Sequence, residues 1–530
     1  MKRENDPESR PEEPGRDTQE IDTWDAAGAA VVTGGDLGQE SPKPDPVALA
    51  LDPHSADDVT ATDAEAKWNE DADQAAEPKD RSRVLMLWGS RAMIGVLALG
   101  AATGIGFGAV WATGDTGPSI AAEVDTPRFV PQDGRQQVVC PPAHVRLGEM
   151  GAATAGAAGI TQPAVDGADA ASIPLTGVDG AELAVISAPA SSDTVSGVQR
   201  VSVSDDDMSG RALAACTAPS WSQWLVGGST QTGRQSSIVL ANPGEQTARV
   251  SLEVFDIDGA VAGTGGSQIV IDAGSAQVLD LASLSVGSAS PAVRISSEGS
   301  PVSAFLQQST IRGLEPGGVD VLESTVAVSG EQHFAGVPIG DGHGHGHDGL
   351  ADAEPALRIV ADGAEAQVRL TFDDGSSDPI VTDVRVPATS VYELPLGELG
   401  EGVYSISLES QQSIAAGIRL TPLDTEDHSD FAWMSPARSL DAATVVGIPW
   451  LDREPRLHVL NSAATAQTYL IGDDEVELEP GARITLPVDD EEIRLQGDGL
   501  RASVTYLDSG AAAFTVQPSP AATAAIAVEQ

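Results

Sequence analysis

Apolar positions along this chain follow two different patterns. Residues 92–112 form one uninterrupted apolar run of 21 residues without a charged side chain. Beyond residue 128, Val, Ile, Leu and Thr occur in short alternating runs separated by Gly, Pro, Asp and Asn. A 21-residue helix is roughly 31 Å long, close to the ~30 Å hydrocarbon core of a bilayer. The first pattern therefore predicts a transmembrane helix, and the second predicts antiparallel β-strands.

The alternating runs recur as a threefold repeat. Similar stretches begin at Leu225, Val337 and Ile448, which are 112 and 111 residues apart, and expected strands follow each in the same order. Each unit holds six or seven expected strands in roughly 85–110 residues, as in immunoglobulin-like domains. The predicted fold is mainly β, with tandem Ig-like antiparallel β-sandwich modules. A propeller ranks second, because it would need more blades at a shorter period.

The chain then divides into seven expected segments. Residues 1–83 hold 22 Asp and Glu against 9 Lys and Arg and few large apolar residues, so they cannot bury enough surface to offset their ordering entropy. The segments are a disordered acidic tail (1–83), a juxtamembrane basic segment with the transmembrane helix (84–112), a linker (113–127), a membrane-proximal β module (128–218), a β-sandwich module (219–333), a β-sandwich module with a His-rich loop (334–444), and a β-sandwich module with the C-terminal tail (445–530).

Basic residues beside the apolar run predict its orientation. Lys79, Arg81, Arg83 and Arg91 precede it, whereas the next basic residue after it is Arg128. The positive-inside rule then places the N-terminus in the cytoplasm and the C-terminal bulk outside. A cleaved signal peptide ending near residues 119–121 is the alternative, but a signal peptide begins with a much shorter polar region than this tail. We expect a single-pass protein of the cytoplasmic membrane.

Small residues recur every four positions within the apolar run. They are Gly100, Gly104, Gly108 and Ala112. This spacing lets two helix backbones approach closely and indicates a homodimer contact. The competing interpretation is the ordinary abundance of Gly and Ala in membrane helices.

The chain has only two cysteines, Cys140 and Cys216, and both follow the apolar run. In an oxidising compartment two thiols favour one disulfide, which here would close a loop of about 77 residues and contribute a few kcal/mol. Neither cysteine has the CxxC spacing of a metal or redox site. We expect the disulfide.

A formal net charge of −50 limits the classes of partner. It disfavours nucleic acid, anionic lipid surfaces and teichoic-type polymers, and it suits solubility, divalent cations or basic partners. We expect no nucleic-acid partner. The expected partner is an envelope protein or glycan.

The run at residues 343–347 is the strongest local candidate for a metal site. Alternate imidazoles in an extended loop could share one divalent ion, with a carboxylate completing its coordination. The candidate ligands are His343, His345, His347, Asp341 and Asp348. Drift in a low-complexity loop would produce the same string. No other cofactor is expected, and acidic clusters such as 205–207 and 373–374 are expected to be turns rather than Ca²⁺ sites.

Catalytic signatures are missing from the sequence. There is no GxSxG, HExxH or SxxK motif, and no P-loop follows an expected strand. Trp221, Trp224, Trp433 and Trp450 are expected in core or intermodule packing. We therefore predict a protein that is not an enzyme.

The layout resembles a family of actinobacterial membrane-anchored, extracytoplasmic proteins of unknown function. The resemblance covers about residues 84–525 and depends on the single span, the cysteine-bracketed region that leads into residues 221–228, and the strand–Asn-Pro-Gly–strand motif at residues 238–254. It implies an extracytoplasmic location and a β fold, and it assigns no functional residues.

Three functions remain open at this level. The leading one is a non-enzymatic, membrane-anchored scaffold or binding protein of the cell envelope. The second is an accessory subunit or cryptic enzyme of cell-wall polysaccharide assembly. The third is a metal-binding ectodomain that uses the His-rich loop.

Overall fold

The computed structural model describes residues 128–131, 134–148, 151–165, 167–190, 194–261, 268–340, 354–423, 430–507, 510–520 and 526–529. They belong to one compact unit, Glu123–Gln530. The acidic tail, the apolar run at 92–112 with its glycine face, and the His-rich loop lie outside the described residues. Within the described ranges, we find no helix of the length and apolarity needed to cross a bilayer.

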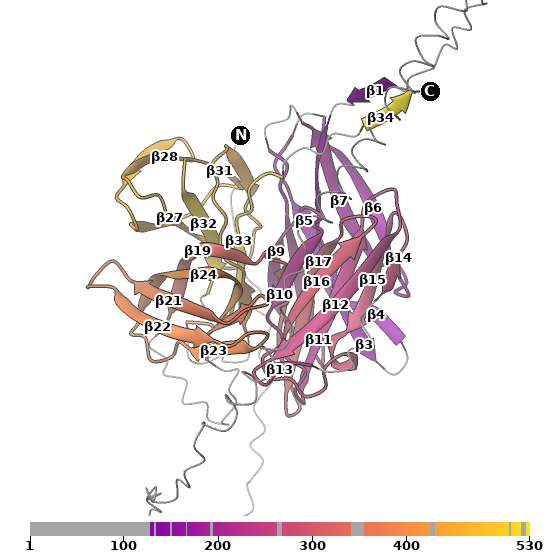
Figure 1. Ribbon diagram of the computed structural model, residues 1–530, viewed down its shortest axis with the longest axis horizontal. Helices are drawn as coiled ribbons and strands as arrows, with labels where there is room; N and C mark the ends of the chain where they lie inside the picture. The colour runs from indigo at the N-terminus through magenta and orange to yellow at the C-terminus, as the bar shows by residue number, and fades with distance from the viewer. Residues whose placement is uncertain are drawn as a thin grey trace, which may run out of the picture. The chain divides into compact units, whose positions relative to one another are not determined.

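The described chain is mainly β, as the alternating runs predict, and its one short helix is the 3-10 turn η1 (Leu281–Ser283) (Figure 1). Strand β21 shows why these segments form strands. Val368, Leu370 and Phe372 are buried while Gln367 and Arg369 are exposed, so alternate residues face a core.

The same strand order occurs three times along the chain. In the third repeat one sheet runs β26-β31-β28-β29 and the other runs β30-β27-β32-β33. The third-repeat strands are β26 (Thr444–Gly447), β27 (Arg456–Asn461), β28 (Gln467–Ile471), β29 (Asp474–Leu478), β30 (Arg483–Pro487), β31 (Glu492–Gln496), β32 (Leu500–Tyr506) and β33 (Ala512–Thr515). Side chains from both sheets join one buried cluster, so the two sheets pack face to face.

The first repeat has the corresponding orders β10-β16-β12-β14 and β18-β17-β11-β15. Its strands are β10 (Ser222–Val226), β11 (Arg234–Asn242), β12 (Ala248–Asp256), β13 (Gly259–Ala260), β14 (Ile269–Ile271), β15 (Ser275–Asp280), β16 (Ala292–Glu298), β17 (Ser303–Arg312) and β18 (Glu315–Glu323).

In the second repeat one long strand, β24, serves both sheets, so the orders are β19-β24-β21-β22 and β25-β24-β20-β23. The strands are β19 (Val328–Ile339), β20 (Ala356–Ala361), β21 (Ala366–Asp373), β22 (Ile380–Val386), β23 (Val391–Pro395), β24 (Gly402–Leu420) and β25 (Ala432–Met434). The first strand of each repeat pairs with the sixth-strand position, whereas in a constant-type immunoglobulin domain it pairs with the second. The structure thus supports repeated two-sheet units and does not confirm the Ig-like strand order.

The region before the first repeat shares a sheet with it. Strand β6 pairs in parallel with β15, which extends the β18-β17-β11-β15 sheet by β6, β7 and β2 across the expected boundary at 218/219. Strands β5, β8 and β9 form a separate three-stranded sheet. The strands are β1 (Arg128–Pro131), β2 (Arg135–Val139), β3 (His144–Gly148), β4 (Gly151–Ala155), β5 (Ala157–Thr161), β6 (Asp169–Thr176), β7 (Glu182–Pro189), β8 (Val198–Ser204), β9 (Ser209–Ala215) and, paired with β1, β34 (Ile526–Glu529).

Buried asparagines close the second strand of two repeats. Asn242 donates its amide to main-chain carbonyls of the following loop and of the neighbouring chain at residues 271–272, and its Oδ1 accepts from the Gly244 N–H. Asn461 makes the corresponding bonds in the third repeat. In the second repeat the same strand ends at Ala361. The motif at residues 238–254 therefore marks a structural turn.

The last strands of the three repeats meet at the middle of the unit. Strand β18 lies against β25, β25 against β33, β33 against β9, and β9 against β18. Two glycines permit close approach between repeats: a Cβ on Gly417 would collide with the main chain of Val226, and one on Gly336 would collide with His458. The repeats are therefore packed together rather than strung apart.

Arg358 joins the first and second repeats. Its side chain is fully buried, its guanidinium donates to the carbonyls of Gly228 at 3.0 Å and Pro291 at 2.9 Å, and its Nε donates to Glu393 at 2.8 Å. The guanidinium also lies 4.8 Å from the ring centroid of Trp433. A buried charge stays in place only if its partners do, so these contacts fix the two repeats relative to each other.

Replacing this guanidinium should destabilise the whole unit. Arg358→Met removes the donors to Gly228 and Pro291 and leaves the Glu393 carboxylate without its buried partner, so we expect a loss of about 3–5 kcal/mol in the free energy of unfolding. The matched control is Arg369→Met, because Arg369 is more than half exposed and lies 3.9 Å from Asp383. That control should cost less than about 1 kcal/mol. Denaturant unfolding checks both, and equal losses would contradict the role of Arg358.

Candidate functional site

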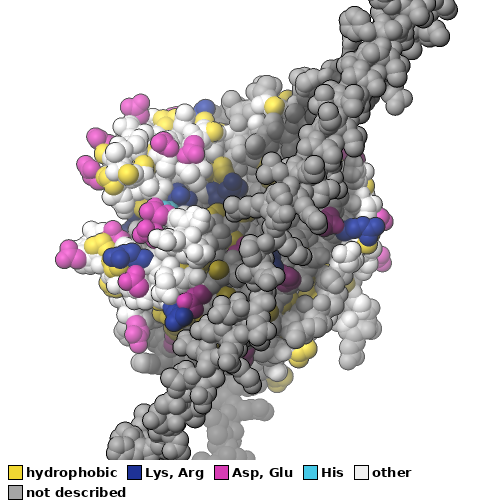
Figure 2. Space-filling view, viewed as in Figure 1, with side chains coloured by type: hydrophobic (Ala, Val, Ile, Leu, Met, Phe, Trp, Pro, Cys, Tyr) yellow, Lys and Arg dark blue, Asp and Glu magenta, His cyan; other side chains and the backbone are white. Residues whose placement is uncertain are grey.

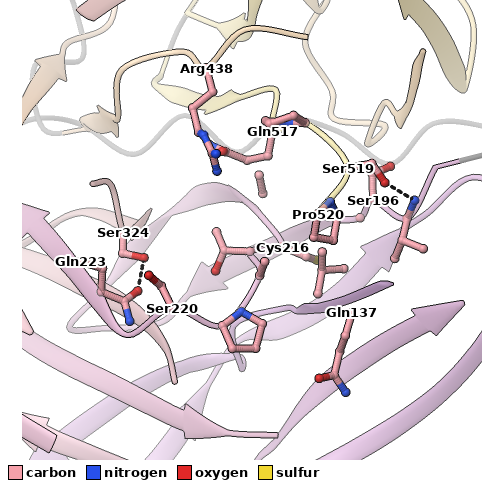
Figure 3. Close-up of a pocket in the computed structure, with 18 of the residues that line it drawn as sticks. Gln137, Ser196, Cys216, Ser220, Gln223, Ser324, Arg438, Gln517, Ser519 and Pro520 are labelled. Carbon is pink, nitrogen blue, oxygen red and sulfur yellow. Dashed lines mark hydrogen bonds between the residues drawn. The ribbon is translucent and has the colours of Figure 1, made fainter. Parts of the chain in front are cut away.

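A cavity of about 880 Å³ lies where four parts of the chain meet. Its walls come from β2, β8 and β9, from β10 and adjoining loops of the first repeat, from residues 435–438 after β25, and from the C-terminal segment 514–520. Figure 3 shows Arg438 extending into this space beside Gln517, with Ser220, Gln223 and Ser324 on another wall. No single segment could form such a site.

Residues 216–224, which lead from the end of β9 into β10, form one wall, and main-chain hydrogen bonds hold them on several sides. Its bonded pairs are Thr217 with Val139, Ser220 with Val302, and Trp224 with Thr325, at 2.7–3.1 Å. In the wall, these bonds use the main-chain N–H and C=O groups of Thr217 and Ser220. Its side chains are therefore left to contact a ligand.

The predicted disulfide is confirmed and stands beside the cavity. Cys140, after β2, is bonded to Cys216, which lines the space. Gly197 packs against this bond, and a Cβ there would lie 2.9 Å from the Cys216 Sγ. The disulfide thus fixes the ends of β2 and β9 at the cavity wall.

The cavity differs sharply in charge from the rest of the chain. The protein carries 79 Asp and Glu, and Figure 2 shows acidic side chains spread over the visible face of the unit. Among the described lining residues there is no carboxylate and there are two arginines. The polar lining side chains are Arg135, Gln137, Ser196, Thr217, Ser220, Gln223, Gln246, Ser324, Thr325, Ser435, Arg438, Gln517 and Ser519.

The two lining arginines differ in their hydrogen-bond and ion-pair partners. Arg135 forms an ion pair with Asp169 at 2.8 Å and also donates to Ser187. Arg438 is exposed, and its guanidinium has no hydrogen-bond or ion-pair partner within the part of the chain that the structure describes. A guanidinium presents up to five donors and pairs well with carboxylate or phosphate. Arg438 is therefore the lining guanidinium whose donors are open to a ligand.

Trp221 lines the same space and corrects one sequence prediction. The tryptophans were expected in packing, and Trp224 and Trp433 are indeed 1% and 2% exposed. Trp221 is 54% exposed and Trp450 is 77% exposed, so neither is a core residue. At the cavity, the Trp221 indole offers a broad apolar face to a ligand.

The serine hydroxyls of the cavity donate to protein acceptors. Ser196 donates to the Val445 carbonyl at 2.6 Å, Ser220 to the Ser222 carbonyl at 2.9 Å, and Ser519 to Gln136 at 2.6 Å. In these three cases the hydrogen points at a carbonyl or amide oxygen, whereas a fourth lining serine, Ser435, donates to the Glu323 carboxylate at 2.8 Å. The arrangement suits recognition of a ligand through polar contacts.

The other sites expected from the sequence have separate outcomes. The candidate metal ligands around residues 341–348 and the glycine face at 100–112 lie outside the described residues. Asp205 accepts from the N–H groups of Asp207 and Met208, and Asp374 accepts from those of Ser376 and Ser377, so both clusters form turns as expected. Among the described residues, no three or more His, Cys, Asp or Glu side chains are placed to bind one metal ion.

Arg438 and Trp221 could not be singled out from the sequence. Neither belongs to a motif, and the cavity brings them together with residues as distant in the chain as Arg135 and Ser519. Local charge gives no signal either, because Asp441 follows Arg438 three residues later in the sequence.

Buried carboxylates lie behind the cavity wall. The Ser435 hydroxyl donates to Glu323 at 2.8 Å, and the Trp433 N–H donates to Asp320 at 2.6 Å. Burial raises the pKa of Glu323 to about 7 and raises the pKa of Asp320 well above its usual value. Burial therefore stabilises the protonated form of both carboxyl groups relative to an exposed carboxyl group.

Glu323 should make stability depend on pH. Its pKa is raised from 4.5 to about 7 on folding, so its contribution is fully present below about pH 4.5 and is lost as pH rises through 7. Relative to Glu323→Gln, the wild type should lose about 1 kcal/mol of unfolding free energy between pH 6 and 8. Glu409→Gln, at an exposed position, is the control: it retains Glu323 and should lose the same unfolding free energy as the wild type between pH 6 and 8. Denaturant unfolding at pH 6 and pH 8 checks this. The prediction is contradicted if the difference in unfolding free energy between the wild type and Glu323→Gln is the same at both pH values.

Comparison with known proteins gives a family without an assigned activity. No curated protein matches the chain. A solved structure described as the crystal structure of Thermotoga maritima 1070 matches with 20% identity over 20% of this chain and 92% of that chain, at a TM-score of 0.18. The model of a family of unknown function, DUF5719, matches residues 164–479, and the chain belongs to this family.

Proposed function

We propose that the protein is a non-enzymatic binding protein of the cell envelope, anchored by residues 92–112 and presenting its β unit outside the cytoplasmic membrane. Its ligand occupies the cavity between the region before the first repeat, the first repeat and the C-terminal segment. The observation that carries this proposal is the cavity without carboxylates in a chain of net charge −50.

The properties of the cavity support binding. Its volume lies within the roughly 300–1,000 Å³ typical of small-molecule sites, and its walls combine an apolar indole with placed amides and hydroxyls. The main chain and a disulfide hold these walls, so little ordering is needed when a ligand enters.

The disulfide supports the location. Disulfides persist in oxidising compartments outside the cytoplasm. The Cys140–Cys216 bond connects strands that carry the cavity, so the same environment that allows the bond also maintains the site. This agrees with the orientation that the basic residues before the apolar run predict.

Site-directed photo-crosslinking in intact cells of the native host tests the proposal. A p-benzoylphenylalanine in place of Gln517, which lines the cavity, should give a light-dependent adduct that fractionates with the cell envelope. The same group in place of Asp378, an exposed turn residue of the second repeat, is the control and should not give this adduct. The proposal fails if position 517 captures a cytoplasmic component, gives no adduct, or gives the same adducts as position 378.

A further inference from the structure

We propose that the cavity binds an acidic saccharide, in which Arg438 pairs with a carboxylate or phosphate group and Trp221 packs against the face of a sugar ring. This inference rests on the proposed function in one respect, namely that the cavity holds a ligand. The chemical class of that ligand is argued separately below.

Charge gives the first argument. The acidic surface as a whole disfavours anions, so an anionic ligand must be held by a local contact. Arg438 provides it, because its guanidinium is exposed at the cavity and has no partner in the described part of the chain. An arginine can bind the two oxygens of a carboxylate or phosphate in a bidentate manner. The described cavity lining contains no carboxylate to compete for it.

The neutral groups give the second argument. Gln137, Gln517 and Ser324 line the cavity, and glutamine amides carry both donors and acceptors. A sugar ring presents several hydroxyls of the same dual character around its edge and C–H groups on its faces. The half-exposed indole of Trp221 fits such a face. A cavity of about 880 Å³ has room for one or two sugar units.

At one wall of the cavity, residues 217–224, main-chain hydrogen bonds disfavour an acidic peptide. An extended peptide commonly binds by pairing its main chain with a free strand edge. Along the wall at residues 217–224, the main-chain groups of Thr217, Ser220 and Trp224 already pair with other parts of the protein. Side chains therefore provide most of the contacts open to a ligand at this wall.

Isothermal titration calorimetry on the full-length protein tests the inference. The probes are digalacturonate, galactose 6-phosphate, neutral galactobiose and an acidic tetrapeptide. We expect one of the two acidic sugars to bind at least tenfold more tightly than galactobiose, and the comparison between them distinguishes carboxylate from phosphate. The inference is overturned if neither acidic sugar binds, or if the peptide binds more tightly than both.

Two substitutions assign the contacts. Arg438→Gln should weaken binding of the acidic sugar at least tenfold and leave galactobiose binding unchanged, whereas Trp221→Ala should weaken both. The matched control is Arg385→Gln, at an exposed arginine of the second repeat that pairs with Glu365, and its affinity should equal that of the wild type. Thermal unfolding midpoints equal to the wild type verify that the variants are folded. Unchanged acidic-sugar affinity in Arg438→Gln would refute the assignment.

The two proposals can fail separately. If acidic sugars bind through Arg438 but position 517 captures only cytoplasmic components, the envelope function is wrong and the ligand class stands. If position 517 captures an envelope component and excess digalacturonate or galactose 6-phosphate fails to compete, the ligand class is wrong and the envelope function stands.

Discussion

The buried guanidinium of Arg358 is the contact on which the arrangement of the repeats depends. Removing a charge from water costs several kcal/mol, and only well-placed partners offset that cost. Here the partners come from two repeats: main-chain carbonyls of the first and Glu393 of the second. A change in the angle between the repeats would take the carbonyl acceptors of the first repeat away from the guanidinium and leave it paired with Glu393 alone. The buried contacts of Arg358 therefore constrain how the first and second repeats are placed relative to each other.

This constraint has consequences beyond the interface itself. Trp433, whose ring lies near Arg358, donates its indole N–H to Gln308 at 2.8 Å and its main-chain N–H to Asp320. The buried polar groups behind the cavity wall therefore belong to the same connected set as the interface. Because residues 435–438 follow β25 directly, the position of Arg438 is set by how the second repeat packs on the first. The geometry of the site therefore depends on how the repeats pack together.

Much of the fold was accessible from the sequence. Alternation of apolar residues predicts the strands, the equal spacing of Leu225, Val337 and Ile448 marks the recurring strand order, and two cysteines allow only one intramolecular disulfide. The parallel pairing of β6 with β15 was not accessible, because strands about 100 residues apart share no turn that could signal it. Arg438 and Trp221 also escaped prediction, since exposure at a cavity is a property of the packed unit and not of the local sequence. The alternation of apolar residues and the length of each repeat predict strands and the size of a unit, but they do not determine which strands pair, so the Ig-like strand order could not be derived from them.

Hydrogen–deuterium exchange on the full-length protein, with and without saturating acidic sugar, tests the central claim that one ligand site forms where distant segments meet. We expect slower exchange in residues 217–223, 435–438 and 516–520 together, because all three segments line the same cavity. Exchange in exposed strand β22 of the second repeat should not change. Protection confined to one of the three segments, or appearing only elsewhere in the unit, would contradict the account.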